Sequence, residues 1–136
     1  MIINATPHTV TIYKQSDCEY NESQRKLIVK TGAKPIKKIT PSGKLLNACI
    51  EHMRVEDIFD TPVYVPRIFD IDDPEDVFDD LKSGDVIIVS RQYAAAHDLW
   101  VGDHKMPYRL ACISQPVYDN PKNPRPIGCL GLEIVS

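Results

Sequence analysis

The sequence predicts a single α+β domain over residues 1–136, with a mostly antiparallel or barrel-like sheet of about seven or eight short strands and two short helices. Three observations predict this class. Short runs rich in β-branched residues recur along the chain, turn residues separate most of them, and only two segments carry helix signals. Because tight turns join strands of opposite direction, we expect antiparallel pairing to dominate.

Most of the predicted strands are short and bounded by turn residues. We expect strands over residues 2–3, 10–14, 27–30, 36–40, 63–71, 86–89, 109–115 and 127–135, with residues 45–50 also extended. Residues 15–25 are polar, which predicts a loop. Residues 51–62 are ambiguous, because their apolar residues have helical spacing but Pro62 would end a helix quickly.

The first helix is predicted to begin at Asp73. The Asp73 side chain can accept hydrogen bonds from free helix amides, and Pro74 suits the first helical position. Glu75 and Asp76 favour the positive end of the helix dipole. We expect this helix to end at Gly84.

The second helix follows the most apolar strand of the chain. Val86–Val89 is a continuous apolar run, as in a strand buried on both faces, and Ser90 is a good N-cap for a helix over Arg91–Trp100. Gly102 is the predicted stop. Three side chains are spaced to share one helical face: Tyr93, His97 and Trp100.

The last part of the chain contains a proline-rich segment. Residues 116–126 hold four prolines and two asparagines, so we expect an exposed loop or arm without regular structure. In the strand that follows, Gly128 and Gly131 leave room for another group to approach closely.

Composition excludes several classes of protein. The net charge of −3 gives no bulk attraction to nucleic acid, and no apolar run is long enough to span a bilayer. The N-terminus lacks the pattern of a signal peptide, so we expect a protein of the cytoplasm with reduced cysteines. Cys49, Cys112 and Cys129 lie in apolar runs and are predicted core residues, whereas Cys18 is predicted to be exposed.

Charge is segregated along the chain. From Arg25 to Arg54 there are eight basic residues and one acid, and from Glu56 to Asp85 there are eleven acids and two bases. This pattern is compatible with a basic face for anions, with subunits that meet head to tail, or with solvated faces. We expect a homo-oligomer in which the basic half of one subunit lies near the acidic half of another.

The strand-to-helix junction at Ser90 is the best candidate for a binding site. Free backbone amides and a hydroxyl at the positive end of a helix favour an anion, although Ser90 can equally serve only as a cap. Arg91 and nearby lysines would offset charge, and Tyr93 or Trp100 could stack on a base.

Motifs for catalysis and metal binding are mostly absent. Ser42-Gly43-Lys44 matches the end of a phosphate-binding loop, but Lys38 stands where that loop needs glycine. Neither the histidines nor the acids match a ligand pattern of zinc or calcium, so we expect no metal and no cofactor. His8, placed by Pro7, could act as a base or satisfy a buried carbonyl.

Four short motifs resemble a family of small bacterial and phage proteins. They are Asn4-Ala5-Thr6-Pro7-His8, Pro41-Ser42-Gly43, Ile88-Val89-Ser90 with Ala94-Ala95-Ala96, and Gly128-Cys129 with Leu132. The resemblance implies a phage or prophage setting and singles out Thr6, His8, Ser42, Gly43 and Ser90, but it implies no reaction. This chain departs from the family pattern at Leu45-Leu46-Asn47, where members often carry arginine, and in the insert over residues 116–126.

The sequence favours a binding protein that is not an enzyme. We expect it to hold a small anionic, nucleotide-like ligand and to sequester a cyclic or ADP-ribosyl defence signal without turnover. The expected ligand-binding residues are Thr6, His8, Ser42, Gly43, Ser90, Arg91, Tyr93 and Trp100. Two alternatives stay open: a hydrolase of a phosphorylated or nucleotide substrate with His8 as base, and an interaction protein that grips a partner through residues 116–126.

Overall fold

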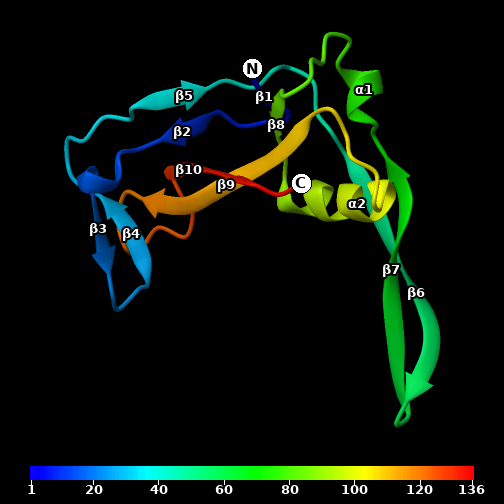
Figure 1. Cartoon of the computed structure of the whole chain (residues 1–136). Coiled ribbons are helices and arrows are strands. Elements are labelled where there is room, and N and C mark those ends of the chain that lie inside the picture. The colour runs from blue at the N-terminus through cyan, green and yellow to red at the C-terminus, as the bar shows by residue number, and fades with distance from the viewer.

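The computed structural model describes residues 1–136 and contains ten strands, two α-helices and one short 3-10 helix (Figure 1). The strands are β1 (Ile2–Asn4), β2 (Val10–Ile12), β3 (Cys18–Asn21), β4 (Lys26–Val29), β5 (Lys37–Ile39), β6 (Ala48–Ile58), β7 (Thr61–Ile71), β8 (Val86–Ile88), β9 (Arg109–Tyr118) and β10 (Gly128–Ile134). The α-helices are α1 (Pro74–Val77) and α2 (Arg91–Val101), and the 3-10 helix covers Gln15–Asp17. No helix has the length and apolar character that crossing a membrane requires.

Eight of the strands form one nearly closed, barrel-like sheet, which confirms the predicted α+β class. The strand order is β1-β8-β9-β10-β2-β5, with β4 pairing with the far end of β9 and β3 pairing with β4. Four strand pairs are parallel and four antiparallel, but the antiparallel ones are longer: they join 23 residue pairs, against nine in the parallel ones, so antiparallel pairing dominates as predicted. The long strand β9 connects the two kinds of pairing, because it pairs antiparallel with β10 and parallel with β8 near its start and with β4 near its end.

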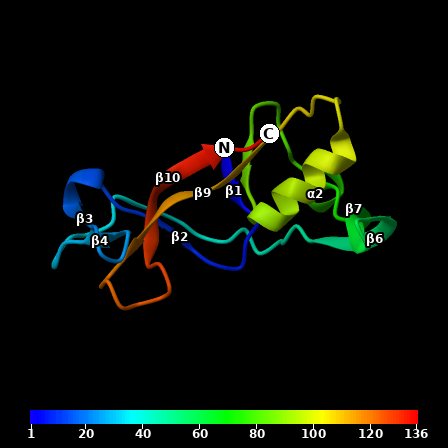
Figure 2. The same cartoon turned by 90° about the horizontal axis from the view of Figure 1, so that it is seen from below.

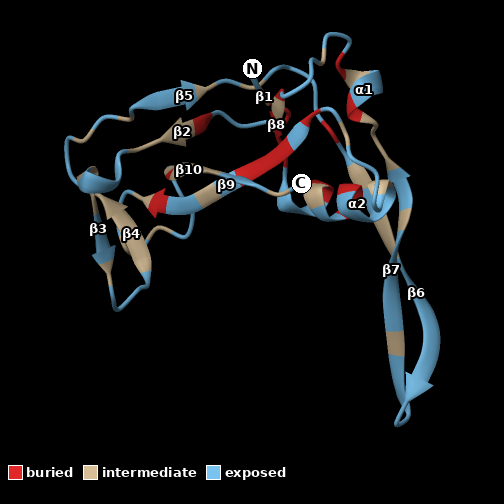
Figure 3. Ribbon diagram, viewed as in Figure 1, coloured by how far each residue is buried: buried red, intermediate tan, exposed pale blue.

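The core lies where β8, β9 and α2 meet (Figure 3). Ile87 and Ile88 are fully buried because β8 is flanked by β1 and β9, as the continuous apolar run predicted. Leu110 and Cys112 of β9 join the buried residues under α2, and Val10 of β2 packs with Ile88 in a smaller second cluster.

Both predicted helix starts are confirmed, but one helix is much shorter than expected. The Ser90 hydroxyl accepts a hydrogen bond from the amide of Tyr93 at 3.1 Å, and α2 stops at Gly102, whose φ is +56°. The Asp73 carboxylate likewise accepts from the amide of Glu75 at 2.9 Å. However, α1 ends at Val77, because the next residue, Phe78, turns to an extended conformation and is buried in the core.

Two predictions of irregular structure are wrong in part, and the segment left ambiguous forms strands. The expected loop over residues 15–25 contains the 3-10 helix and β3, and residues 116–118 continue β9 as a strand. In the second case, the partner strand β4 lies about 90 residues away in sequence, so local residues cannot reveal it. The ambiguous residues 51–62 contain no helix and form most of a long hairpin.

That hairpin, β6 with β7, projects from the body of the molecule, and we call residues 48–71 the arm (Figure 1). Its base contacts α2, where the Tyr93 hydroxyl donates a hydrogen bond to the carbonyl of Asp72. Residues 52–62 are all exposed. Cys49 is also exposed rather than a core residue, because it belongs to this projecting element.

Candidate functional site

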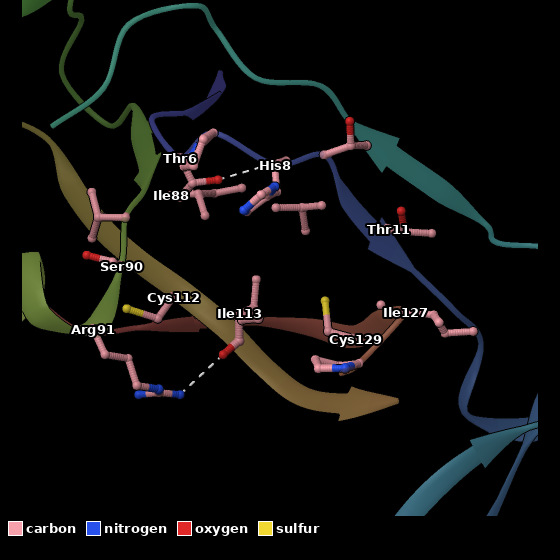
Figure 4. Close-up of a pocket in the computed structure, with 16 residues that line it drawn as sticks. Thr6, His8, Thr11, Ile88, Ser90, Arg91, Cys112, Ile113, Ile127 and Cys129 are labelled. Carbon is pink, nitrogen blue, oxygen red and sulfur yellow. Dashed lines mark hydrogen bonds between the residues drawn. The ribbon is translucent and has the colours of Figure 1, made fainter. Parts of the chain in front are cut away.

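A cavity of about 540 Å³ opens where the β8–α2 junction faces the loop before β2 (Figure 4). Strands β9 and β10 complete its walls. Four of the predicted ligand-binding residues line it: Thr6, His8, Ser90 and Arg91. They come from two parts of the chain more than 80 residues apart, and a concave site of this volume is in the range that holds small molecules.

The deep part of the cavity is apolar. Ile88, Cys112 and Cys129 contribute neighbouring side chains from β8, β9 and β10, and all three residues are buried. Burial raises the pKa of the Cys112 and Cys129 thiols, which keeps them uncharged at neutral pH. The two cysteines therefore act here as small hydrophobic residues, as predicted, and Cys18 is half-buried rather than exposed.

Asn4 shapes the polar loop at the mouth of the cavity, a role that was not predicted from the sequence. Its side-chain amide donates to the carbonyls of His8 at 2.8 Å and Ile39 at 3.0 Å. Its side-chain oxygen accepts from the Thr6 amide at 3.0 Å and from the Thr6 hydroxyl at 2.7 Å. The signal was present, since Asn two residues before Thr is typical of an Asx turn.

The same network determines what the two predicted loop residues can offer. The Thr6 hydroxyl is already bonded to the Asn4 side chain, so it can donate to a ligand only by leaving that contact. The His8 imidazole is exposed and forms no hydrogen bond within the chain; only the His8 carbonyl is used. His8 is therefore available as a donor or acceptor at the cavity mouth.

The helix start offers backbone amides rather than strong positive charge. The amides of Arg91 and Gln92 have no acceptor within the chain. The Arg91 guanidinium donates to the Ile113 carbonyl at 3.2 Å and pairs with Glu133 at 3.0 Å, so part of its charge is already offset (Figure 4). The lysines predicted to assist Arg91 do not line the cavity.

The other four predicted ligand-binding residues lie outside the cavity. Tyr93 is 1% exposed and packs in the core, so it cannot stack on a base. Trp100 lies near the opposite end of α2, edge-on to His97 with ring centres 5.7 Å apart. Ser42 and Gly43 form a turn in which the Ser42 hydroxyl donates to the Lys44 carbonyl at 3.0 Å.

Tyr93 and Trp100 were predicted to contact the ligand, but the helix face that carries them does not line the cavity. The face shared by Tyr93, His97 and Trp100 was correctly recognised, but much of it is directed at protein. His97 is buried, and its Nε2 atom lies 2.7 Å from the Tyr108 hydroxyl. Only the first residue of the helix, Arg91, reaches the cavity.

Several cavity residues were missed because only the fold brings them together. They are Pro7, Thr9, Val10, Thr11, Ile88, Val89, Cys112, Ile113, Pro126, Ile127, Gly128 and Cys129. Gly128 had a recognisable signal: a Cβ there would lie 2.5 Å from the Thr11 carbonyl oxygen, so glycine is required where β10 meets β2. A Cβ at Gly131 would meet nothing within 4 Å, so close approach is predicted correctly for only one of the two glycines.

The rest of the molecule contains weaker candidates for a functional site. No group of three or more His, Cys, Asp or Glu side chains is placed to hold a metal ion. A second cavity of about 350 Å³ lies beside the end of α2, next to His97 and His104. Comparison of the chain with protein-family models, curated proteins and solved structures finds no match.

Proposed function

We propose that the protein binds a small nucleotide-like molecule in the 540 Å³ cavity and holds it without turnover. The observation that supports this most is the composition of the cavity: an apolar interior with a few polar groups around it, which is typical of small-molecule sites. The apolar interior suits a base or another planar ring. The free amide of Arg91, at the start of α2, suits a phosphate or similar anion.

Binding accounts for this geometry better than hydrolysis does. A nucleophilic mechanism needs a nucleophile beside a base, with a third group that orients the base. Here the Ser90 hydroxyl caps α2, the His8 imidazole has no hydrogen-bonded partner, and no carboxylate side chain lines the cavity. The hydrolase alternative would show itself as conversion of a bound nucleotide to product.

The proposal also covers the biological origin of the protein and its oligomeric state. The resemblance carried by the Asn-x-Thr-Pro-His and Gly-Cys motifs supports a phage or prophage protein of the host cytoplasm that sequesters a cyclic or ADP-ribosyl defence signal. The segregated charge supports assembly into a homo-oligomer. The proline-rich segment over residues 116–126 supports a partner-binding role less well, because it is bonded to the body of the chain. The Lys26 ammonium donates to the carbonyls of Asn123 at 3.0 Å and Pro121 at 3.4 Å.

Two substitutions of equally exposed isoleucines test the ligand proposal. Ile113 on β9 lines the cavity, whereas Ile134 on β10 does not, and both are 41% exposed. Ile113→Trp should fill the cavity with little effect on folding, and Ile134→Trp is the matched control. Isothermal titration calorimetry of both variants and the wild type would use a panel of cyclic and ADP-ribosyl nucleotides, with inorganic phosphate included.

We expect the wild type and Ile134→Trp to bind one nucleotide class with equal affinity, and Ile113→Trp to lose that binding. Chromatography of the recovered ligand should show it unchanged, whereas a product would favour the hydrolase. Equal binding by both variants would place the ligand elsewhere, and no binding by any protein across the panel would contradict the proposal.

A further inference from the structure

The arm is exposed along most of its length (Figure 3), and many of its exposed residues are large and apolar. Its exposed large apolar side chains are Met53, Val55, Ile58, Phe59, Tyr64, Val65 and Phe69. From their exposed fractions, the three aromatic residues alone present on the order of 450 Å². Phe59 lies in the turn and Phe69 near the base, so this exposed apolar area extends along the length of the arm.

The tip of the arm combines exposure with backbone strain. Phe59 and Asp60 form the two-residue turn, with φ values of +47° and +59°. Such turns favour Asn and Gly, and a bulky aromatic residue rarely adopts positive φ. Phe59 is nevertheless 98% exposed, so packing of its ring within the chain does not compensate for the strain. A strained, protruding aromatic residue is what a contact with another molecule would stabilise.

The charges of the arm indicate what kind of surface it meets. Residues 48–71 contain five acids and two arginines, a net charge of −3. The arginines are already paired, Arg54 with Asp57 and Arg67 with Glu51, which leaves unpaired acids along the arm. Two arms laid side by side would repel each other, so the complementary surface is basic.

Strand β5 provides a basic surface with a free edge. We call residues 34–39 the β5 edge. The strand pairs only with β2, so its other side has unpaired backbone groups, which is typical of a strand that can accept another strand. Lys34, Lys37 and Lys38 are exposed there without an acidic partner, and Ile36 is 65% exposed between them.

The arm and the β5 edge cannot meet within one molecule. The two views place β5 at an edge of the barrel-like sheet and the tip of the arm beyond α2, at the other end of the molecule (Figures 1 and 2). The two surfaces are therefore left for contacts between different molecules. The two surfaces are complementary in charge, because the arm has unpaired acids and the β5 edge has unpaired lysines. Both also expose apolar side chains: aromatic rings on the arm and Ile36 on the edge.

The prolines of β7 indicate which side of the arm is used. Pro62 and Pro66 have no N–H, so they occupy positions whose N–H would point away from β6. The outer edge of β7 therefore lacks two of its donors and is a poor partner for another strand. The outer edge of β6, which contains no proline, keeps its donors and acceptors.

We propose that the arm of one copy docks on the β5 edge of a second copy, with the outer edge of β6 alongside β5 and Phe59 as the apolar anchor. If the exchange is mutual, each copy buries both an arm and an edge, so the contact is formed twice around a two-fold axis, as in a closed symmetric dimer. This inference rests on the self-association proposed above and is independent of the ligand.

Charge-swapped variants test the pairing directly by sedimentation velocity. Lys37→Glu with Lys38→Glu reverses the edge, and Glu56→Lys with Asp70→Lys reverses two acids of the arm that form no ion pair; all four residues are exposed. Each double variant alone should self-associate about tenfold more weakly or worse, because like charges then face each other. An equimolar mixture of the two variants should regain the mixed assembly, since an acidic surface again meets a basic one.

The control makes the same change of charge elsewhere on the surface. Lys105→Glu with Lys122→Glu changes two exposed lysines outside both surfaces and should leave self-association unchanged. A monomeric wild type, equal weakening by the control, or a mixture that fails to assemble would overturn the inference. Calorimetry on the same proteins keeps the two proposals apart, because a monomeric variant that still binds nucleotide leaves the ligand proposal intact.

The anchor has its own test, in which stability and assembly change in opposite directions. Phe59→Asn puts a residue that favours positive φ into the turn, so the melting temperature of the monomer should rise. The same change removes the anchor and should weaken self-association. A variant that melts higher and still assembles as the wild type does would exclude Phe59 as the anchor.

Discussion

Asn4 shows how one buried side chain can determine the shape of a binding loop. It is 1% exposed, and its amide group makes four hydrogen bonds that connect β1, the Thr6–His8 loop and β5. The sequence marked Thr6 and His8 as residues of interest, but the group that positions them is Asn4. Its importance depends on the carbonyl of Ile39, which lies 35 residues away and cannot be predicted from local sequence.

Gly128 should be far more sensitive to substitution than Gly131. Gly128→Ala places a Cβ 2.5 Å from the backbone oxygen of Thr11, so β10 or β2 must move, and we expect a loss of about 1–3 kcal/mol in the free energy of unfolding. Gly131→Ala is the matched control, because it meets nothing within 4 Å. Urea denaturation measures both; equal stabilities of the two variants would contradict the close approach of β2 and β10.

His97 should make stability depend on pH in the weakly acidic range. Burial lowers the pKa of His97 below its ordinary value of 6.5, against the opposing influence of Asp73 and Asp98. The unfolded chain then binds a proton at a higher pH than the native protein does, so native stability should fall as the pH falls below about 6.5.

The His97→Gln variant isolates that effect, because glutamine can hydrogen-bond the Tyr108 hydroxyl but does not titrate. Denaturation curves for the wild type and the variant would be measured at pH values above and below 6.5. We expect the stability difference to shift in favour of the variant on acidification. A difference that does not change with pH would show that His97 does not titrate as described.

At the scale of elements, the β8–α2 unit was the most predictable part of the chain. Its strand, cap, helix and stop all depend on neighbouring residues: an apolar run, Ser90 and Gly102. The arm was the least predictable, because its turn is Phe59-Asp60 rather than a typical hairpin pair such as Asn-Gly, and its exposed apolar residues also have helical spacing. Local propensity does not distinguish a hairpin from a helix in such a segment.

The cap of α2 carries a prediction at this scale. Ser90→Ala removes the acceptor for the Tyr93 amide and should reduce the free energy of unfolding by about 1 kcal/mol. Ser90→Thr keeps an acceptor at the same position and should retain most of the stability. Thermal and urea denaturation compare the variants; if alanine were as stable as threonine, the cap would contribute nothing to the helix.

For the whole molecule, the α+β class and the barrel-like sheet followed from short strands and few helix signals, but the pairing of the strands did not. Parallel pairs such as β1 with β8 and β4 with β9 join segments more than 80 residues apart. The same long-range pairing builds the cavity. Sequence could therefore identify Thr6, His8, Ser90 and Arg91, but not the β9 and β10 residues opposite them.

The most direct measurement of the central claim is native mass spectrometry of the protein purified from its host, followed by denaturation and identification of whatever is released. We expect the wild type and Ile134→Trp to carry one intact nucleotide-like molecule per chain, and Ile113→Trp to carry none, because the tryptophan fills the cavity. A wild type that carries no small molecule and binds none of the nucleotide panel would contradict the claim.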